Sequence, residues 1–124
     1  MRRLVLVALL AVLAGCASQN YLVDPHGYDQ SGSASWYGAR HQGKRTASGE
    51  SFDQNSLTGA HRQLPFGTRV LVTNLANART VVVRINDRGP HTRSRLIDIS
   101  RAAAGQLGML QSGTARVRVQ ALDD

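Results

Sequence analysis

Residues 68–86 read TRVLVTNLANARTVVVRIN, and this stretch decides the fold. Two runs rich in Val, Leu, Ile and Thr, at 68–74 and 79–86, are joined through Ala76 and Asn77. Residues of these types favour extended strands, and a short break between two such runs predicts a β-hairpin. The protein is therefore expected to be built mainly of short β-strands.

The chain on either side of this hairpin continues the pattern of short apolar runs and turn residues. Further strands are predicted at 35–37, 56–61, 95–99 and 116–121, with a long loop at 38–53 and a turn at 64–67. Ser100 is a suitable N-cap for a short helix at 101–107, which Gly108 can end. Six short strands with one small helix predict a compact β-barrel, although periodicity does not give the strand order.

Composition limits the class of protein. A chain of 124 residues has room for one domain, and 15 Lys and Arg against 8 Asp and Glu give it a net charge of +7. This excess of basic residues favours an anionic partner such as nucleic acid, anionic lipid or a carboxylate-rich polymer. The single cysteine, Cys16, excludes an intrachain disulfide framework and a zinc site that needs two or more thiolates.

The first 15 residues are typical of an export signal. A pair of arginines is followed by an unbroken apolar run at 4–13, which is too short for a membrane-spanning helix of about 20 residues. The tetrad Leu13-Ala14-Gly15-Cys16 resembles a bacterial lipobox, so we expect a lipoprotein signal peptide at 1–15 and a lipid on Cys16. The alternative is an ordinary secretory signal with an incidental cysteine.

The segment 16–31 is polar, lacks periodicity and contains Pro25, so it is predicted to be the lipidated cysteine followed by a flexible tether. Removal of 1–15 would leave a net charge of +5. By resemblance to lipoprotein sorting, Ala17 favours the outer membrane over the inner membrane. We therefore expect an outer-membrane lipoprotein that faces the periplasm of a Gram-negative bacterium.

Several motifs occur in an order that resembles one known family. They are Ala34-Ser35-Trp36-Tyr37-Gly38, Thr46-Ala47-Ser48-Gly49-Glu50, Ala60-His61 with Leu64-Pro65-Phe66-Gly67-Thr68, and Val83-Arg84-Ile85-Asn86-Asp87-Arg88-Gly89-Pro90. Asp98-Ile99-Ser100 and the alanines at 102–104 follow. Over residues 32–122 the chain resembles the rare lipoprotein A (RlpA) family of septal-ring lytic transglycosylases.

This resemblance implies a mainly β fold, a six-stranded double-psi β-barrel with one or two short helices, at 32–122. It also implies action on peptidoglycan glycan strands. A lytic transglycosylase breaks the β-1,4 bond between N-acetylmuramic acid (MurNAc) and N-acetylglucosamine (GlcNAc) without water, leaving 1,6-anhydro-MurNAc ends, in wall remodelling and daughter-cell separation. Many family members continue into a SPOR domain. The sequence stops at Asp124, so no SPOR domain is expected.

Asp87 is the candidate general acid, since it follows an apolar strand and matches the aspartate that the family uses. Glu50 and His61 also match the family's site. Glu50 could share proton work with Asp87, because two close carboxyl groups push one pKa up, and His61 could orient a carboxylate or relay a proton. Arg88 opposes an acid role for its neighbour, whereas Arg84 is expected to face away. Without the family, the residues alone favour a turn role for Asp87, a surface role for Glu50 and a structural role for His61.

The resemblance also implies a set of substrate-binding residues. They are Tyr37, Thr46, Ser48, Asn86 and Arg88. Tyr37 is expected to stack on a sugar, whereas Trp36, on the opposite face of the strand, is expected to pack in the core. Asp98 is expected to be a structural acid near Ser100, and Arg95 an exposed residue.

Other functions are weighed against this one. Expansins use the same barrel to loosen wall polysaccharides without cutting them, so a non-catalytic peptidoglycan-binding lipoprotein is the alternative. The export signal and the lack of a basic helix or an aromatic RNA-binding motif argue against nucleic acid. The four histidines show no paired ligand spacing, so no metal or other cofactor is expected. We expect a monomer.

Overall fold

The computed structural model describes residues 22–123, which form a β-barrel with one α-helix and one short 3-10 helix. The strands are β1 (Asp29–Tyr37), β2 (Thr58–Ala60), β3 (Arg69–Asn74), β4 (Thr80–Asp87), β5 (Arg95–Ser100) and β6 (Thr114–Ala121). The helices are η2 (Ala39–His41) and α2 (Arg101–Leu107). The predicted hairpin is confirmed as β3 and β4, which pair in antiparallel register from Arg69 with Arg84 to Thr73 with Thr80.

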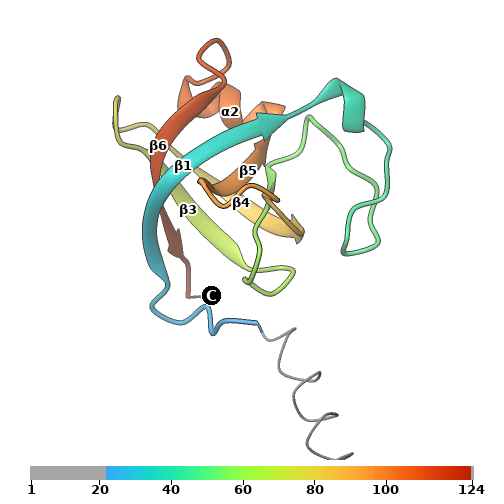
Figure 1. Cartoon of the computed structure of the whole chain (residues 1–124), viewed down its shortest axis with the longest axis horizontal. Coiled ribbons are helices and arrows are strands. Elements are labelled where there is room, and N and C mark those ends of the chain that lie inside the picture. The colour runs from blue at the N-terminus through green and yellow to red at the C-terminus, as the bar shows by residue number, and fades with distance from the viewer. Residues whose placement is uncertain (1–21, 124) are drawn as a thin grey trace, which may run out of the picture.

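The six strands close on themselves in the order β1-β5-β2-β4-β3-β6. The pairs β1/β5 and β2/β4 run parallel, and the other neighbours run antiparallel. In Figure 1, β1 and β6 cross the front of the barrel, α2 lies at one end, and the loop after β1 extends to the side. The parallel pairs bring together strands that are far apart in the sequence, and they decide where the site forms.

Along β3 and β4, buried side chains alternate with more exposed ones, and the buried ones form much of the core. Val70 and Val72 from β3 and Val81, Val83 and Ile85 from β4 are all less than 5% exposed. Each such side chain stabilises the fold by about 1.5–3 kcal/mol through its removal from water. Strands β5 and β6 add further buried residues, and the core is continuous from the barrel to α2.

Helix α2 has both ends that the sequence predicts. The Ser100 Oγ accepts a hydrogen bond from the backbone N–H of Ala103 at 3.3 Å. Gly108 follows the last turn with a φ of 70°, in the left-handed region that favours glycine. The buried face of α2, Ala103, Ala104 and Leu107, closes one end of the barrel. Within residues 22–123, no helix combines the length and apolar character needed to cross a membrane.

The barrel begins before the boundary predicted for it. Strand β1 starts at Asp29 and pairs with β6, so the last three residues of the tether expected at 16–31 belong to the barrel. Val23 is also fixed to the domain, since its N–H donates to the carbonyl of Gln63 at 3.0 Å. The sequence hides this because 29–33 is polar. The predicted signal peptide and Cys16 lie outside the described residues.

A buried asparagine joins the β3–β4 turn to α2. The Asn74 Nδ2 donates to the Leu107 carbonyl at 2.9 Å, and its Oδ1 accepts from the Ala76 N–H at 3.0 Å. Asn74→Ala should lower the free energy of unfolding by about 1–3 kcal/mol, because it leaves buried groups unpaired. Asn77→Ala is the matched control, since the exposed Asn77 donates to the same carbonyl. Urea unfolding should show a smaller loss for the control, and equal losses would contradict this role for Asn74.

Candidate active site

The site forms where β4 loses its regular alternation. Gly59 of β2 pairs with Ile85, but the next residue, Ala60, pairs with Asp87, so Asn86 is left as a bulge. Ile85 and Asn86 are consequently both buried, and the side chain of Asp87 emerges at the rim of the barrel. The strand end expected to hold the acid is therefore fixed by its pairing with β2.

Backbone groups hold the Asp87 carboxylate in place. Its Oδ1 accepts hydrogen bonds from the N–H groups of Ala47 and Arg88, both at 2.9 Å. Among the described residues no hydrogen bond reaches Oδ2. The Asp87 backbone carbonyl accepts from the His61 N–H at 3.1 Å. One carboxylate oxygen is thus anchored while the other is available to a ligand.

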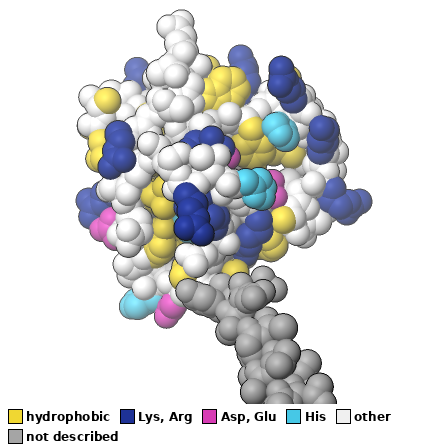
Figure 2. Space-filling model, viewed as in Figure 1, with side chains coloured by type: hydrophobic (Ala, Val, Ile, Leu, Met, Phe, Trp, Pro, Cys, Tyr) yellow, Lys and Arg dark blue, Asp and Glu magenta, His cyan; other side chains and the backbone are white. Residues whose placement is uncertain are grey.

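An open cleft of about 460 Å³ lies against this carboxylate. Its walls include Trp36 and Tyr37 from β1, His41 from η2, Asp87 from β4, Asp98 from β5, and the loop residue His91. Figure 2 shows histidine side chains bordering a recess in which hydrophobic and acidic atoms are visible, and basic side chains scattered over the surrounding surface. The cleft therefore combines aromatic walls with carboxylates, a combination suited to carbohydrate.

Arg88 lines the cleft but does not form an ion pair with Asp87 in the described part of the chain. Its Nη1 donates to the carbonyls of His61 at 3.1 Å and Leu64 at 2.8 Å, and its guanidinium lies 4.0 Å from the ring centre of Phe66. The arginine expected to oppose an acid at Asp87 is therefore held by the 61–66 turn through its Nη1.

Glu50 lies in an ion pair outside the residues that line the cleft. Both of its carboxylate oxygens accept from Arg84, at 2.7 and 3.2 Å. The hydrogen bond from Arg84, together with one from Asn86, holds the pKa of Glu50 below its ordinary value of 4.5. A carboxyl group with a lowered pKa is ionised at neutral pH, so this geometry does not support the shared proton expected between Glu50 and Asp87.

The Arg84 pairing can be tested directly because Glu50 is the only glutamate in the sequence. Glutamate-selective ¹³C labelling gives one carboxyl signal, whose NMR titration should have its midpoint below 4.5. Arg84→Gln should move that midpoint upward, since the guanidinium is the main cause of the lowered pKa. Arg101→Gln, at an exposed position of α2, is the control and should leave it unchanged. A midpoint at or above 4.5 in the wild type would contradict the pairing.

His61 is buried at 3% exposure, and both of its ring nitrogens are engaged. Nδ1 accepts from the N–H groups of Gln63 and Leu64, each at 3.1 Å, so it carries no proton. Nε2 therefore carries the proton and bonds the hydroxyl of Tyr28 at 2.8 Å. Burial and the positive charges of Arg62 and Arg88 lower the pKa of His61 to about 4. The ring is thus a neutral anchor with no nitrogen available for a proton relay.

Thr46 and Ser48, expected to bind substrate, have internal partners instead, and Asn86, expected to do the same, is buried with an unpaired Oδ1 among the described residues. The Thr46 hydroxyl donates to the Glu50 carbonyl at 2.8 Å and lies 2.9 Å from the Ser48 hydroxyl. The Ser48 N–H donates to the Asn86 carbonyl at 3.2 Å. Asn86 is buried at 2% exposure. These contacts hold the 46–50 loop on the end of β4, where it delivers the Ala47 N–H to Asp87.

The neighbours Trp36 and Tyr37 both line the cleft. Trp36 is half-buried and packs against the core, as expected, while also contributing to the cleft wall. Tyr37 stacks on Phe52 with ring centres 4.4 Å apart, and its buried hydroxyl has no hydrogen-bond partner among the described residues. Burial, with the negative charges of Asp87 and Asp98, raises the pKa of Tyr37. This hydroxyl is therefore a buried donor with no partner in the described part of the chain.

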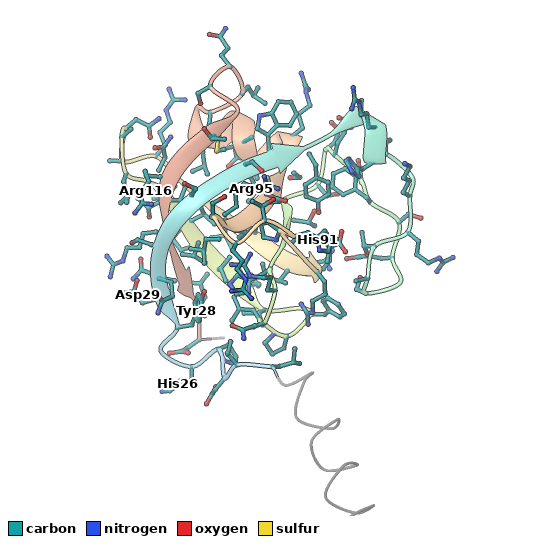
Figure 3. The ribbon with its side chains drawn as sticks, in the orientation of Figure 1. His26, Tyr28, Asp29, His91, Arg95 and Arg116 are labelled. Carbon is teal, nitrogen blue, oxygen red and sulfur yellow. The ribbon has the colours of Figure 1, made fainter. Side chains whose placement is uncertain are left out.

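Asp98 is a cleft residue that sequence reasoning placed elsewhere. The parallel register of β1 and β5 sets Ser35 beside Asp98, and Arg95 of the same strand bonds its carboxylate. Figure 3 shows Arg95 and His91 on the same side of the barrel. The signal available in the sequence was a charged residue between two isoleucines, which does not reveal the strand beside it. Within residues 22–123, no group of three or more His, Cys, Asp or Glu side chains is placed to hold a metal ion.

Comparison with known proteins identifies the family of this chain. Residues 29–119 match the family model DPBB_1, described as lytic transglycolase. The chain belongs to the RlpA family. The Synechocystis sp. protein named "Probable endolytic peptidoglycan transglycosylase RlpA" is 62% identical over 86 residues, which are 69% of this chain and 27% of that protein. "Endolytic peptidoglycan transglycosylase RlpA" of Neisseria meningitidis is 48% identical over 93 residues, which are 75% of this chain and 39% of that protein. The chain thus spans well under half the length of these RlpA relatives.

Solved structures show the RlpA barrel in proteins with other names. The Streptomyces papain inhibitor has a TM-score of 0.64 and 24% identity, covering 78% of this chain and 96% of that one. A mutant Clavibacter michiganensis expansin in complex with cellohexaose has a TM-score of 0.63 and 17% identity, covering 78% and 52%. These likenesses concern the fold alone. They confirm the expected six-stranded double-psi β-barrel.

Proposed function

We propose that this domain is a lytic transglycosylase that cleaves peptidoglycan glycan strands between MurNAc and GlcNAc and leaves 1,6-anhydro-MurNAc ends. The observation that carries the proposal is the Asp87 carboxylate at an open cleft, with Oδ1 held by two backbone N–H groups and Oδ2 available. The names of the RlpA relatives support peptidoglycan as the substrate.

In this reaction a protonated Asp87 gives its proton to the glycosidic oxygen as the bond from that oxygen to C1 of MurNAc breaks. The O6 hydroxyl of the same MurNAc then bonds to C1 in place of water. Its proton passes to the Asp87 carboxylate, which restores the acid for the next cycle. Because one residue closes the proton balance, a second carboxylate is not needed for proton transfer, unlike in ordinary glycosidases.

The remaining site residues support this acid in two ways. Tyr37 and Arg88 line the cleft, and we assign them to the substrate. We assign Glu50 and His61, with Thr46, Ser48 and Asn86, to positioning, because their hydrogen bonds run to the loops and strand that fix Asp87.

Analysis of reaction products tests the proposal. Purified glycan strands incubated with the protein should yield new 1,6-anhydro-MurNAc ends, detected by mass spectrometry, and no new reducing MurNAc ends. New reducing ends would instead identify a hydrolase. Tight binding without new ends of either kind would favour the alternative, an expansin-like peptidoglycan-binding protein, to which the fold is equally suited.

We further propose that the protein acts in the periplasm, attached to the outer membrane through a lipid on Cys16. The lipobox-like tetrad that ends at Cys16 supports attachment to the membrane, and the net positive charge supports attraction to the anionic wall. Radiolabelled palmitate should enter the wild-type protein in cells and should not enter Cys16→Ser. Equal labelling of both would contradict lipidation at this residue, and recovery in the inner-membrane fraction would contradict the outer-membrane assignment.

A further inference from the structure

Two aspartates face the cleft from strands on either side of β2. Ala60 of β2 pairs with Asp87 of β4 on one edge and with Asp98 of β5 on the other. All three residues line the cleft. The small side chain of Ala60 therefore forms a floor between two carboxylates.

The spacing of these strands sets the distance across the Ala60 floor. Neighbouring strands lie about 4.8 Å apart, so the backbones of Asp87 and Asp98 are roughly 9–10 Å apart. This separation leaves room for a sugar ring between the two side chains.

The contacts of Asp98 fix the orientation of its carboxylate without using all of its hydrogen-bond acceptor positions. Its Oδ1 accepts from the Ser35 hydroxyl and from the Arg95 Nε at 3.0 Å, and its Oδ2 accepts from the Arg95 Nη2 at 3.4 Å. A carboxylate offers about four acceptor positions, so about one is left. The Asp98 side chain is still 18% exposed, which lets a ligand in the cleft reach it.

We propose that Asp98 is a substrate-binding residue, which accepts a hydrogen bond from an N–H or O–H group of the sugar on the side of the cleft opposite Asp87. This inference rests on the proposed function, since it names a contact within the same site. Ser35 is the positioning residue that holds the Asp98 carboxylate toward the cleft, and Arg95 pairs with the same carboxylate without being required for that orientation. Hydrogen bonds to a charged acceptor are stronger than those between neutral groups, so one such contact orients the sugar ring.

The binding role of Asp98 can be tested by measuring the affinity for a GlcNAc–MurNAc tetrasaccharide by calorimetry. The measurements use an Asp87→Asn background, which prevents turnover. Adding Asp98→Asn should weaken binding by roughly 10- to 100-fold, the effect expected for loss of a charged hydrogen bond. Adding Arg95→Gln should change the affinity by no more than about twofold, because Asp98 keeps Ser35 and gains free acceptor positions. Arg101→Gln, outside the cleft, is the matched control.

If Asp98 had only a structural role, breaking its ion pair with Arg95 from either side would weaken tetrasaccharide binding to the same extent. Equal losses for Asp98→Asn and Arg95→Gln would therefore overturn the proposal, as would unchanged binding by Asp98→Asn. If Asp98→Asn fails to fold, judged by its thermal midpoint, the Arg95→Gln result still decides between the two roles. Absence of anhydro ends with the wild type would refute the proposed function while leaving this binding result intact.

Discussion

Replacement of Asp87 by asparagine is expected to lower the rate of anhydro-end formation by about 10²–10⁴-fold, the range typical for loss of a general acid or base. Asparagine has nearly the same shape and keeps an oxygen that can accept from the Ala47 and Arg88 N–H groups. It has no proton to give to the leaving oxygen. The rate of release of 1,6-anhydro-MurNAc ends, measured by mass spectrometry, should therefore fall while the fold is retained.

Two controls separate this effect from damage to the barrel. Asp123→Asn changes an exposed aspartate outside the cleft and should keep the wild-type rate. Unfolding in urea should give Asp87→Asn a free energy close to that of the wild type, because both backbone donors keep a partner. A rate for Asp87→Asn within about threefold of the wild-type rate would show that Asp87 is not the general acid, because loss of a general acid lowers the rate by at least about 10²-fold.

The elements that could be predicted from the sequence are those whose signals are local. The β3–β4 hairpin follows from two β-branched runs joined by a short turn, and α2 from Ser100 at its start and Gly108 after its end. The start of β1 was missed because Asp29, Gln30 and Ser31 are polar, and their strand conformation depends on pairing with β6, far along the chain.

The site could be predicted only in part, because its parts meet through non-local pairing. Asp87 was identified from the strand end and the family pattern, and it does line the cleft. Asp98 reaches the same cleft through the register of β5 with β1 and β2, which no periodicity reveals. The partner of Arg84 is Glu50, thirty-four residues away, so sequence neighbours were a poor guide to the charge around each carboxylate.

The acid sensitivity of the fold is expected to depend on His61. Its pKa is about 4 in the folded protein and about 6.5 when unfolded, so between these values the unfolded chain binds more protons. The stability from the neutral ring is fully present above pH 6.5 and is lost as the pH falls toward 4. The unfolding free energy should decrease by about 3 kcal/mol across that window, since one pH unit corresponds to about 1.4 kcal/mol.

Urea unfolding at a series of pH values, combined with NMR titration of the histidine rings, measures this effect. The His61 signal should titrate near pH 4, well below the usual range. His91→Gln, which removes an exposed histidine, is the matched control and should show the same loss of stability as the wild type. A stability that stays flat from pH 6.5 to 4.5, or a His61 midpoint between 6 and 7, would contradict the assignment of a buried neutral ring.

Protonation of His61 should also act on the site through the backbone. A proton on Nδ1 removes the acceptor for the Gln63 and Leu64 N–H groups, which shape the turn whose carbonyls hold Arg88. The His61 N–H in turn holds the carbonyl of Asp87. Below about pH 5 we therefore expect activity to fall reversibly. The Tyr28→Phe variant, which lacks the hydroxyl beside Nε2, should be less stable than the wild type even at pH 7. An activity that persists at pH 4 while His61 is protonated would show that the anchored turn is not needed to hold the acid.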